Sequence, residues 1–455
     1  MSGVEKKRIL ILGGGFAGLY AAMHLDRCLA RKADVEITLV NRENFFLFTP
    51  MLHEVAASDL TMSNIVSPVR QLLRHVNFFA GEVESVDLVL KKVVVSHGTV
   101  NHRHALDYDH LVLGLGSVTN FYNLPGLAER AMTMKSLGDA VHLRNRLIAL
   151  LEEADSECCS NIRRPLLTFV VAGGGFAGVE TVAAINDFVR QAMPFYLNLR
   201  KEMLRVVLVH SGEVILPELG ASLGRYAQKK LAERGVEVKA KTRVSRVSDV
   251  SVELSSGESI STRAIIWTAG TSPNPVLNEL PCNKEMGRLR VDETLQVVGY
   301  PGLWAVGDCA LVPNSKKGGY HPTTAQHALR QGKVLAKNLI ATLLGRKLER
   351  FSFTTLGQLA AIGRRTGVAN ILGVNFSGFL AWWLWRTIYL SKLPRLEKKL
   401  RVALDWTLDL LFTKDLVQFH TFRSPAISTR ERSQGNALEG LEATAEQQNH
   451  RTAGA

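Results

Sequence analysis

Two stretches decide the fold: FVVAGGGFAGVE at residues 169–180 and, earlier in the chain, ILILGGGFAGL at residues 9–19. Each is an apolar, β-branched run that leads into G-x-G-x-x-G and then into an Ala-rich helical stretch. In such a turn the first glycine permits a tight strand-to-helix connection. The second lets the backbone approach a pyrophosphate, and the third lets helix and strand pack closely. Two copies predict two bound dinucleotides and electron transfer between them.

The glycines of the two turns are the first candidates for cofactor contacts, because a phosphate would lie on the free amides at each helix N-terminus. They are Gly13, Gly15 and Gly18 in the first turn, and Gly173, Gly175 and Gly178 in the second. One such motif could be an ordinary glycine turn. Its repetition after a second predicted strand argues against that interpretation.

The residues expected to bind the ribose of each dinucleotide match the fingerprint less well than the glycines do. The dinucleotide fingerprint places an acidic residue about 20 residues beyond the turn, where it bonds a ribose hydroxyl. The corresponding segments are EITLVNR at residues 36–42 and LRVVLVHSG at residues 204–212, and neither strand ends in a carboxylate. Asn41 can still bond hydroxyls, whereas His210 is less selective. The sequence therefore does not assure rejection of a dinucleotide that carries a 2′-phosphate.

Composition narrows the class of protein. The chain has 455 residues, 46% of them apolar, which suits two to three domains, and a formal charge of +13. No basic-aromatic nucleic-acid module is present, so no nucleic-acid partner is expected. The five cysteines show neither C-x-x-C nor zinc spacing, which indicates a reducing compartment and no metal. The short N-terminus and the lack of a long apolar run predict neither a signal peptide nor a spanning helix.

The order of motifs predicts an α/β protein of two Rossmann-like domains, one inserted in the other, with a C-terminal α-rich, membrane-associating region. The second unit interrupts the first, because LWAVGDCA at residues 303–310 reads as a return to the first sheet. The predicted parts are residues 8–125 (first dinucleotide unit), 165–290 (second unit), 291–347 (return segment), 348–423 (membrane-surface region) and 424–455 (a disordered tail poor in large apolar residues).

Four further segments bear a family resemblance. They are FTPMLHEVA at residues 48–56, GDCA at 307–310, AQHA at 325–328 and GQLAAIGR at 357–364. With the two glycine turns, they make the chain resemble the type II NADH:quinone oxidoreductases, the single-subunit, non-proton-pumping respiratory NADH dehydrogenases. The resemblance covers residues 8 to about 420. It implies FAD as cofactor, NADH as electron donor and a membrane quinone as acceptor.

The resemblance also implies site residues. The first glycine set would hold FAD, together with Asn41, Arg42, Thr49, Gly116, Ser117, Asp308, Ala325 and Gln326. The second glycine set would hold NADH, together with Glu180, His210, Thr268, Ala269 and Gly270. The family motif on the quinone side reads roughly Ala-Gln-x-Ala-x-Gln. Here Arg330 replaces its last glutamine, although Gln331 follows, so Gln326 is the quinone-side residue we expect.

Glu180 and Gln326 are the catalytic candidates. Glu180 matches a family glutamate between nicotinamide and flavin. Burial beside apolar rings would raise the pKa of its carboxyl and let it hold or relay a proton. The alternative is that Glu180 only anchors the helix start as a hydrogen-bond acceptor. His53, His321 and His327 lie in matched segments, where packed imidazoles are the more common finding.

The C-terminal region predicts a membrane surface. FSGFLAWWLWR at residues 376–386 and VALDWTLDLLF at 402–412 flank a run of lysines and arginines. Tryptophans favour the headgroup boundary, and cations are attracted to anionic lipid. Amphipathic helices of this kind lie on a bilayer rather than cross it. They could instead pack on the chain's own core or form a homodimer interface. The resemblance favours a peripheral enzyme on the cytoplasmic face of the inner (plasma) membrane.

Three rival functions share parts of this pattern. Thiol-linked pyridine nucleotide reductases place a cysteine pair soon after the first unit begins, but residues 41–60 contain no cysteine. A sulfide:quinone oxidoreductase needs paired cysteines near the flavin, for which Cys159 and Cys309 are the only candidates worth naming. A flavoprotein that senses NAD(P)H and binds a partner would not need the quinone-side motif at Ala325-Gln326.

Overall fold

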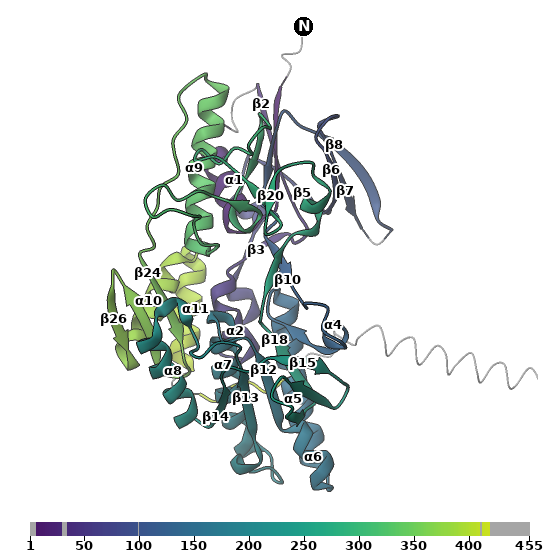
Figure 1. The fold of residues 1–455 in the computed structure, drawn as a ribbon, viewed down its shortest axis with the longest axis vertical. Helices are drawn as coiled ribbons and strands as arrows, with labels where there is room; N and C mark the ends of the chain where they lie inside the picture. Colours follow the sequence, from purple (N-terminus) through teal and green to yellow (C-terminus); the bar gives the residue numbers. More distant parts are fainter. Residues whose placement is uncertain (1–5, 30–33, 99, 410–411, 419–455) are drawn as a thin grey trace, which may run out of the picture. The chain divides into compact units, whose positions relative to one another are not determined.

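A computed structural model of the 455-residue chain describes residues 6–29, 34–98, 100–409 and 412–418 (Figure 1). The chain divides into two compact parts, residues 1–415 and 416–455, and every helix and strand described below lies in the first part. Both dinucleotide units lie in residues 1–415. The predicted tail at 424–455 falls outside the described residues, as do residues 1–5 and 419–423.

The first glycine turn follows the central strand of a five-stranded parallel sheet with the order β22-β9-β1-β2-β5. Its strands are β1 (Lys7–Leu12), β2 (Val35–Asn41), β5 (Asn77–Ala80), β9 (His110–Leu113) and β22 (Leu303–Ala305). β22 joins this sheet from far along the chain, which confirms the predicted insertion of one unit in the other.

The second glycine turn likewise follows the middle strand of a five-stranded parallel sheet, of order β11-β18-β12-β13-β14. Its strands are β11 (Met132–Thr133), β12 (Thr168–Ala172), β13 (Arg205–Val209), β14 (Val236–Lys239) and β18 (Ala264–Trp267). The edge strand β11 precedes residue 165, the predicted start of this unit. Two residues make too short an apolar run for a strand to be predicted there.

The two units repeat one plan beyond their glycine turns. In each, the outermost of the first three strands leads into an antiparallel three-stranded meander, and the chain then returns to the parallel sheet (Figure 1). The meanders are β6 (Glu82–Asp87), β7 (Lys92–His97) and β8 (His102–Asp107) in the first unit, and β15 (Val244–Val247), β16 (Ser251–Leu254) and β17 (Ser259–Ser261) in the second.

Two short strands connect the units. β10 (Ser117–Thr119) leaves the first unit and β19 (Thr271–Pro273) re-enters it, and they pair antiparallel. After β19, the 3-10 segment η6 (Pro275–Glu279) packs on β6, and β21 (Arg288–Arg290) pairs with β23 (Ala310–Leu311). Residues 275–290 therefore pack with the first unit.

The helices cover the sheets and place residues from distant segments together. The principal ones are α1 (Phe16–Cys28), α2 (Leu52–Ala56), α5 (Leu137–Ser156), α6 (Ser160–Leu166), α7 (Phe176–Ala192), α8 (Ala221–Glu233) and α9 (Ala325–Leu343). α9 packs closely along α1 (Figure 1), since a Cβ at Gly332 would lie 2.2 Å from the carbonyl oxygen of Ala17.

The C-terminal region is mainly helical, as predicted, and also contains a small sheet. β24 (Gly357–Ala361), β25 (Gly367–Ile371) and β26 (Val374–Ser377) form an antiparallel sheet, followed by α10 (Gly378–Lys392) and α11 (Leu396–Leu408). The β25–β26 turn has positive φ at both Leu372 and Gly373, as a type I′ hairpin requires. Leucine is an unusual first residue for that turn, so a hairpin is not predicted from the sequence here. Among the described residues, no helix is both long and apolar enough to cross a bilayer.

Candidate active site

The first glycine turn forms an open mouth at the start of α1. Gly13 has φ of +102°, and a Cβ there would lie 2.3 Å from the carbonyl oxygen of Gly114. A Cβ on Gly18 would lie 1.9 Å from the Gly13 carbonyl oxygen, so both positions exclude any side chain. A Cβ on Gly15 would meet nothing within 4 Å. Open space before a helix N-terminus fits a pyrophosphate.

The second turn has the same geometry. Gly173 has φ of +122°, and a Cβ on Gly178 would lie 1.8 Å from its carbonyl oxygen. Gly175 faces open space, as Gly15 does. Thr268 packs over this turn and donates its hydroxyl to the Ala172 carbonyl over 2.8 Å. The chain therefore offers two matched cradles, and both fit a dinucleotide.

Asn41 and His210 occupy equivalent positions at the ends of β2 and β13. Asn41 Oδ1 accepts the Gly14 N–H over 2.8 Å, and His210 Nδ1 accepts the Gly174 N–H over 3.2 Å. Because His210 Nδ1 is an acceptor, the ring proton lies on Nε2, which donates to the Val214 carbonyl over 3.1 Å. A neutral imidazole of this kind does not repel a 2′-phosphate as a carboxylate would.

The return segment brings the predicted flavin residues together. Ser117 donates its hydroxyl to Asp308 Oδ2 over 2.6 Å, across 191 residues of sequence. Lys135 Nζ donates to the same hydroxyl over 2.7 Å. Gly116, with φ of +71°, precedes this contact and has no atom within 4 Å of a Cβ built on it. Asp308 follows Gly307, whose N–H donates to Gln331 Oε1 on α9 over 2.8 Å.

The other flavin-side residues make fewer contacts with this group. Gln326 Nε2 donates to the Gly357 carbonyl over 2.9 Å, which ties Gln326 to β24. Arg330 donates to the Gln326 carbonyl, and its guanidinium stacks 4.0 Å from the Phe353 ring centroid. Arg42 is exposed beside Glu43, and Thr49 begins a 3-10 segment, η1 (Thr49–Met51).

Glu180 lies on α7, two residues beyond the last glycine of the second turn, and is 8% exposed. Its Oε1 accepts the Trp385 indole N–H over 2.9 Å and the Ala361 N–H over 3.2 Å. Its Oε2 lies 3.7 Å from His53 Nδ1, too far for a direct hydrogen bond. Three other elements, α2, β24 and α10, therefore converge on this one carboxyl.

The electrostatics make Glu180 and His53 a neutral pair. Burial raises the pKa of Glu180 to about 8, although the hydrogen bonds from Ala361 and Trp385 favour its ionised form. Burial lowers the pKa of His53 to about 3, with the charge of Lys414 acting in the same direction. At neutral pH the 3.7 Å approach is therefore a contact between a protonated carboxyl and a neutral imidazole, and not an ion pair.

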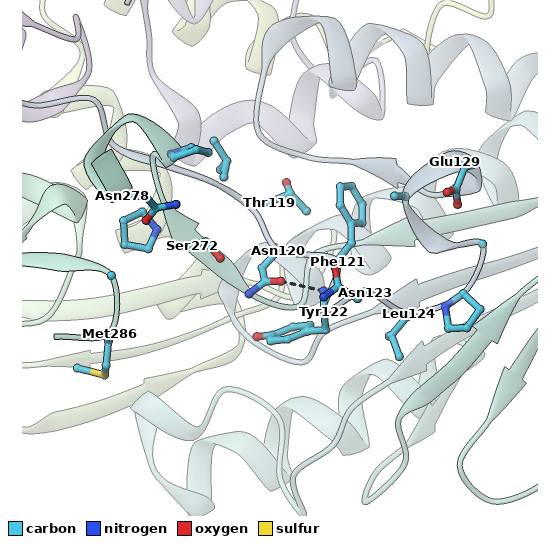
Figure 2. A pocket seen from close by; sticks show the side chains of 17 residues that line it. Thr119, Asn120, Phe121, Tyr122, Asn123, Leu124, Glu129, Ser272, Asn278 and Met286 are labelled. Atoms are coloured by element: carbon cyan, nitrogen blue, oxygen red, sulfur yellow. Dashed lines mark hydrogen bonds between the residues drawn. The ribbon is translucent and has the colours of Figure 1, made fainter. Parts of the chain in front are cut away.

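A cavity of about 700 Å³ lies elsewhere, beside the two connecting strands β10 and β19 (Figure 2). Its walls include Thr119, Tyr122, Ser272 and Met286, and none of the predicted site residues lines it. One link to the site exists. A Cβ on Gly270 would lie 2.4 Å from the Tyr122 hydroxyl, so the Tyr122 ring covers the predicted nicotinamide loop, in which Thr268 and Ala269 precede Gly270.

Comparisons with known proteins give the family. The family model for pyridine nucleotide-disulphide oxidoreductases matches residues 7–332, and the model for the NDH2 C-terminal domain matches residues 356–415. The type II NADH:quinone oxidoreductase Ndh of Mycobacterium tuberculosis is 32% identical over 426 residues, which are 90% of this chain and 89% of that protein. The chain belongs to the type II NADH:quinone oxidoreductase family.

Two further comparisons agree with this assignment. The demethylphylloquinone reductase NdbB of Synechocystis is 32% identical over 411 residues, covering 88% of this chain and 96% of that protein. The fold matches the NDH2 of Plasmodium falciparum, solved in complex with NADH, with a TM-score of 0.85 at 20% identity. That match covers 91% of this chain and all of that one. As a member of the type II NADH:quinone oxidoreductase family, the chain is an enzyme that uses FAD and NADH.

Several residues at the family site were not predicted from the sequence. Trp385 and Trp406 were assigned to the membrane surface, yet they are 0% and 6% exposed and their indole N–H groups bind buried carboxyls. Glu54, the partner of Trp406, stands out in the sequence only as part of the motif at residues 48–56. No local signal marks these three residues, because each acquires its role from a partner more than 200 residues away.

Proposed function

We propose that this chain passes two electrons from NADH through FAD to a membrane quinone without pumping protons, and that Glu180 handles a proton at the quinone side. The observation that best supports this proposal is the position of Glu180. It extends from the second dinucleotide turn into a buried pocket that is closed by the C-terminal region. A carboxyl that is protonated near neutral pH can both give and take a proton there.

FAD, when bound, supplies the difficult chemistry, since it accepts the hydride of NADH and delivers two electrons to the quinone. The chain's own residues bind, orient and exclude water. The first turn, with Asn41 and Asp308, would hold FAD, and the second, with His210 and Thr268, would hold NADH. Gln326, fixed to β24 by its side-chain amide, would face the quinone. Arg330 stacks on Phe353 beside it, where the family has glutamine.

The test is steady-state oxidation of NADH and NADPH by purified protein, with a water-soluble quinone analogue as acceptor and sulfide as an alternative donor. We expect a yellow protein that reduces the quinone with NADH and not with sulfide. Sulfide activity is disfavoured because burial raises the pKa of the Cys309 thiol to about 12, and thiol chemistry needs a thiolate. Cys159, the other candidate, is exposed.

The membrane surface is the second part of this proposal. The outer face of α11 presents leucines at every fourth position, Leu396, Leu400, Leu404 and Leu408, which are between 42% and 72% exposed. Phe379, Leu380 and Trp383 of α10 are each at least half exposed. Basic residues at the junction and on α11 include Lys392, Lys399 and Arg401. An apolar stripe flanked by cations suits a helix pair that lies on anionic lipid, at the cytoplasmic face of the inner membrane.

A sharp test substitutes Leu396 and Leu400 with Asp in one variant. The matched control substitutes Leu90 and Leu197 with Asp; both are exposed, at 67% and 96%, but lie far along the chain from this region. We expect the first variant, and not the control, to lose binding to vesicles that contain anionic lipid. If instead the first variant keeps its binding but changes from dimer to monomer, the leucine stripe is a homodimer interface. Truncation at residue 376 is unsuitable, because it would remove Trp385 from Glu180.

A further inference from the structure

A small polar cavity extends from Glu180 towards the surface. Its volume is about 40 Å³, and a water needs roughly 10–15 Å³ of such space. Its lining includes the buried side chains of Glu180, His53 and Glu54, and the charged side chains of Asp59, Lys414, Asp187, Arg364, Arg386 and Asp409. The cavity therefore joins the carboxyl at the cofactor side to a ring of charged groups.

Glu54 is the second buried carboxyl of this cavity. It is 6% exposed, and its Oε2 accepts the Trp406 indole N–H over 3.1 Å. Burial raises the pKa of Glu54 to about 8, against the opposing effect of the nearby Arg386 charge. Glu54 thus repeats the environment of Glu180: a carboxyl beneath a tryptophan of the C-terminal helices, protonated near neutral pH.

The charges around the cavity support a bound proton independently. Five of the lining side chains are carboxyls and three are Arg or Lys cations, while His53 is neutral. Arg234 adds a fourth cation, because its guanidinium pairs with Asp187 from beside the cavity. With both glutamates ionised, five carboxylates would face four cations, and a poorly hydrated interior disfavours the uncompensated negative charge.

The outer end of the cavity is a set of ion pairs. Lys414 Nζ lies 2.5 Å from Asp59 Oδ1, and these side chains are 4% and 18% exposed. Arg364, at 37% exposure, donates its backbone N–H to Asp187 Oδ2 over 2.7 Å and a guanidinium N–H to the Asp409 carbonyl over 2.6 Å. Arg364 and Asp59 are the most exposed members of this set, whereas Lys414 is as buried as Glu54 and Glu180.

Arg386 gives a separate sign that water occupies the space. Its guanidinium lies between the Trp382 and Trp406 rings, 4.2 Å and 4.6 Å from their centroids. Its buried Nε has no hydrogen-bond partner within the part of the chain that the structure describes. A buried donor of this kind is normally satisfied by ordered water.

Quinol formation makes a definite demand on such a path. NADH delivers a hydride, which is two electrons and one proton, so NADH plus quinone plus one solvent proton gives NAD⁺ plus quinol. We propose that this solvent proton enters through the cavity, from the Asp59–Lys414 rim to Glu54 and then, by way of water beside His53, to Glu180. The inference rests on the proposed function. Glu54 touches neither cofactor nor quinone in this scheme and is a proton-relay residue.

The experiment separates the two half-reactions in FAD-loaded full-length protein by stopped flow. We expect Glu54→Gln to leave reduction of the flavin by NADH unchanged and to slow its reoxidation by a soluble quinone by about tenfold or more. The loss should grow as pH rises, with an altered solvent deuterium isotope effect. Glu54→Asp should recover part of the rate, because a carboxyl returns. A carboxylic-acid stretch in the infrared spectrum at neutral pH should disappear in Glu54→Gln, which gives a readout independent of activity.

A second variant keeps the proposal testable if Glu54→Gln misfolds. Asp59→Asn alters the partly exposed rim and should slow only the quinone step, whereas the control Asp405→Asn changes a carboxyl that binds Asn64 outside the cavity and should slow neither step. The proposal is overturned if reoxidation and its isotope effect are unchanged in both Glu54→Gln and Asp59→Asn. It is also overturned if both half-reactions slow together in Asp59→Asn. Failure of the unaltered protein to reduce quinone would instead refute the proposed function.

Discussion

Trp385 donates its indole N–H to Glu180 Oε1 over 2.9 Å, from a helix that begins almost 200 residues after the glutamate. Two dinucleotide units alone would leave Glu180 open at the start of α7. The C-terminal region closes over it with Trp385 and with the Ala361 N–H, and the resulting burial raises the pKa of the carboxyl. The same helix pair presents its apolar outer face to solvent, so the proposed membrane surface and the proton site share one structural element.

Trp385→Phe should weaken the contact that closes over Glu180 without leaving a cavity there. The substitution keeps an aromatic ring but removes the N–H, so Glu180 Oε1 retains only the Ala361 donor. Loss of one hydrogen bond in a buried site should lower the free energy of unfolding by about 1–3 kcal/mol. It should also raise the pKa of Glu180 further, because that bond favours the ionised form. Denaturant unfolding and the pH profile of quinone reduction measure both effects. Trp383→Phe, on the same helix but half exposed, should change neither.

Glu180→Gln should change how stability depends on pH. The folded protein keeps the Glu180 proton up to about pH 8, while the unfolded chain releases it near pH 4.5. Its contribution to stability is therefore fully present below about pH 4.5 and is lost as pH rises to about 8. We expect the melting temperature of Glu180→Gln to fall less than that of the parent protein over this range. Parallel curves for the two proteins would show that Glu180 ionises normally.

His53 should act in the opposite direction. Its pKa is lowered to about 3 in the folded protein from an ordinary 6.5, so the unfolded chain binds the proton first as pH falls. The stability associated with neutral His53 is present above about pH 6.5 and is lost as pH falls towards 3. His53→Gln should therefore reduce acid destabilisation in a thermal scan at decreasing pH. The exposed His142 on α5 offers the control, since His142→Gln should leave the acid limb in place.

His210→Glu should raise the preference for NADH over NADPH. A carboxylate at this position can accept the Gly174 N–H, as the imidazole does, and can also bond the ribose hydroxyls. It would repel a 2′-phosphate, and like charges placed together cost several kcal/mol, so a change of about tenfold or more in the ratio of kcat/KM values is expected. Asn41→Asp makes the equivalent change in the first unit. It should alter FAD retention and leave that ratio unchanged.

Gly18→Ala and Gly178→Ala should show which dinucleotide each glycine turn binds. Each new Cβ would fall within 2 Å of a backbone carbonyl oxygen in its own turn. Gly18→Ala should yield protein with little or no flavin. Gly178→Ala should keep its flavin but bind NADH weakly, as a raised KM or a higher Kd in titration. If both variants lost flavin equally, the assignment of the first turn to FAD and the second to NADH would be wrong.

The parts of the site that could be predicted from sequence were those encoded locally. The glycine turns, Asn41 and His210 follow from a strand-turn-helix unit. Ser117 and Asp308 were expected near the flavin by resemblance, but their contact across 191 residues is seen only in the structure. The C-terminal sheet was missed because its tightest turn uses Leu372 where glycine or asparagine is usual. β11 was missed because it has only two residues.

Glu54, Trp385 and Trp406 could not be assigned for a different reason. Tryptophans that stand between apolar and basic residues are typical of a membrane boundary. In the structure, however, three of the four tryptophans in this region are buried, either against carboxyls or under Arg386. Only tertiary packing distinguishes the inner face of such a helix pair from its outer face. For the leucines of α11, a spacing of four residues places them on one helix face, and the structure shows that this face is the outer one.

The most direct test of the account is a single anaerobic mixing experiment on the purified protein. NADH should bleach the yellow flavin, and a quinone analogue added next should restore its colour with one quinol formed per NADH consumed. Protein that retains no flavin after reconstitution with FAD, or flavin that NADH bleaches but quinone fails to restore, would contradict it.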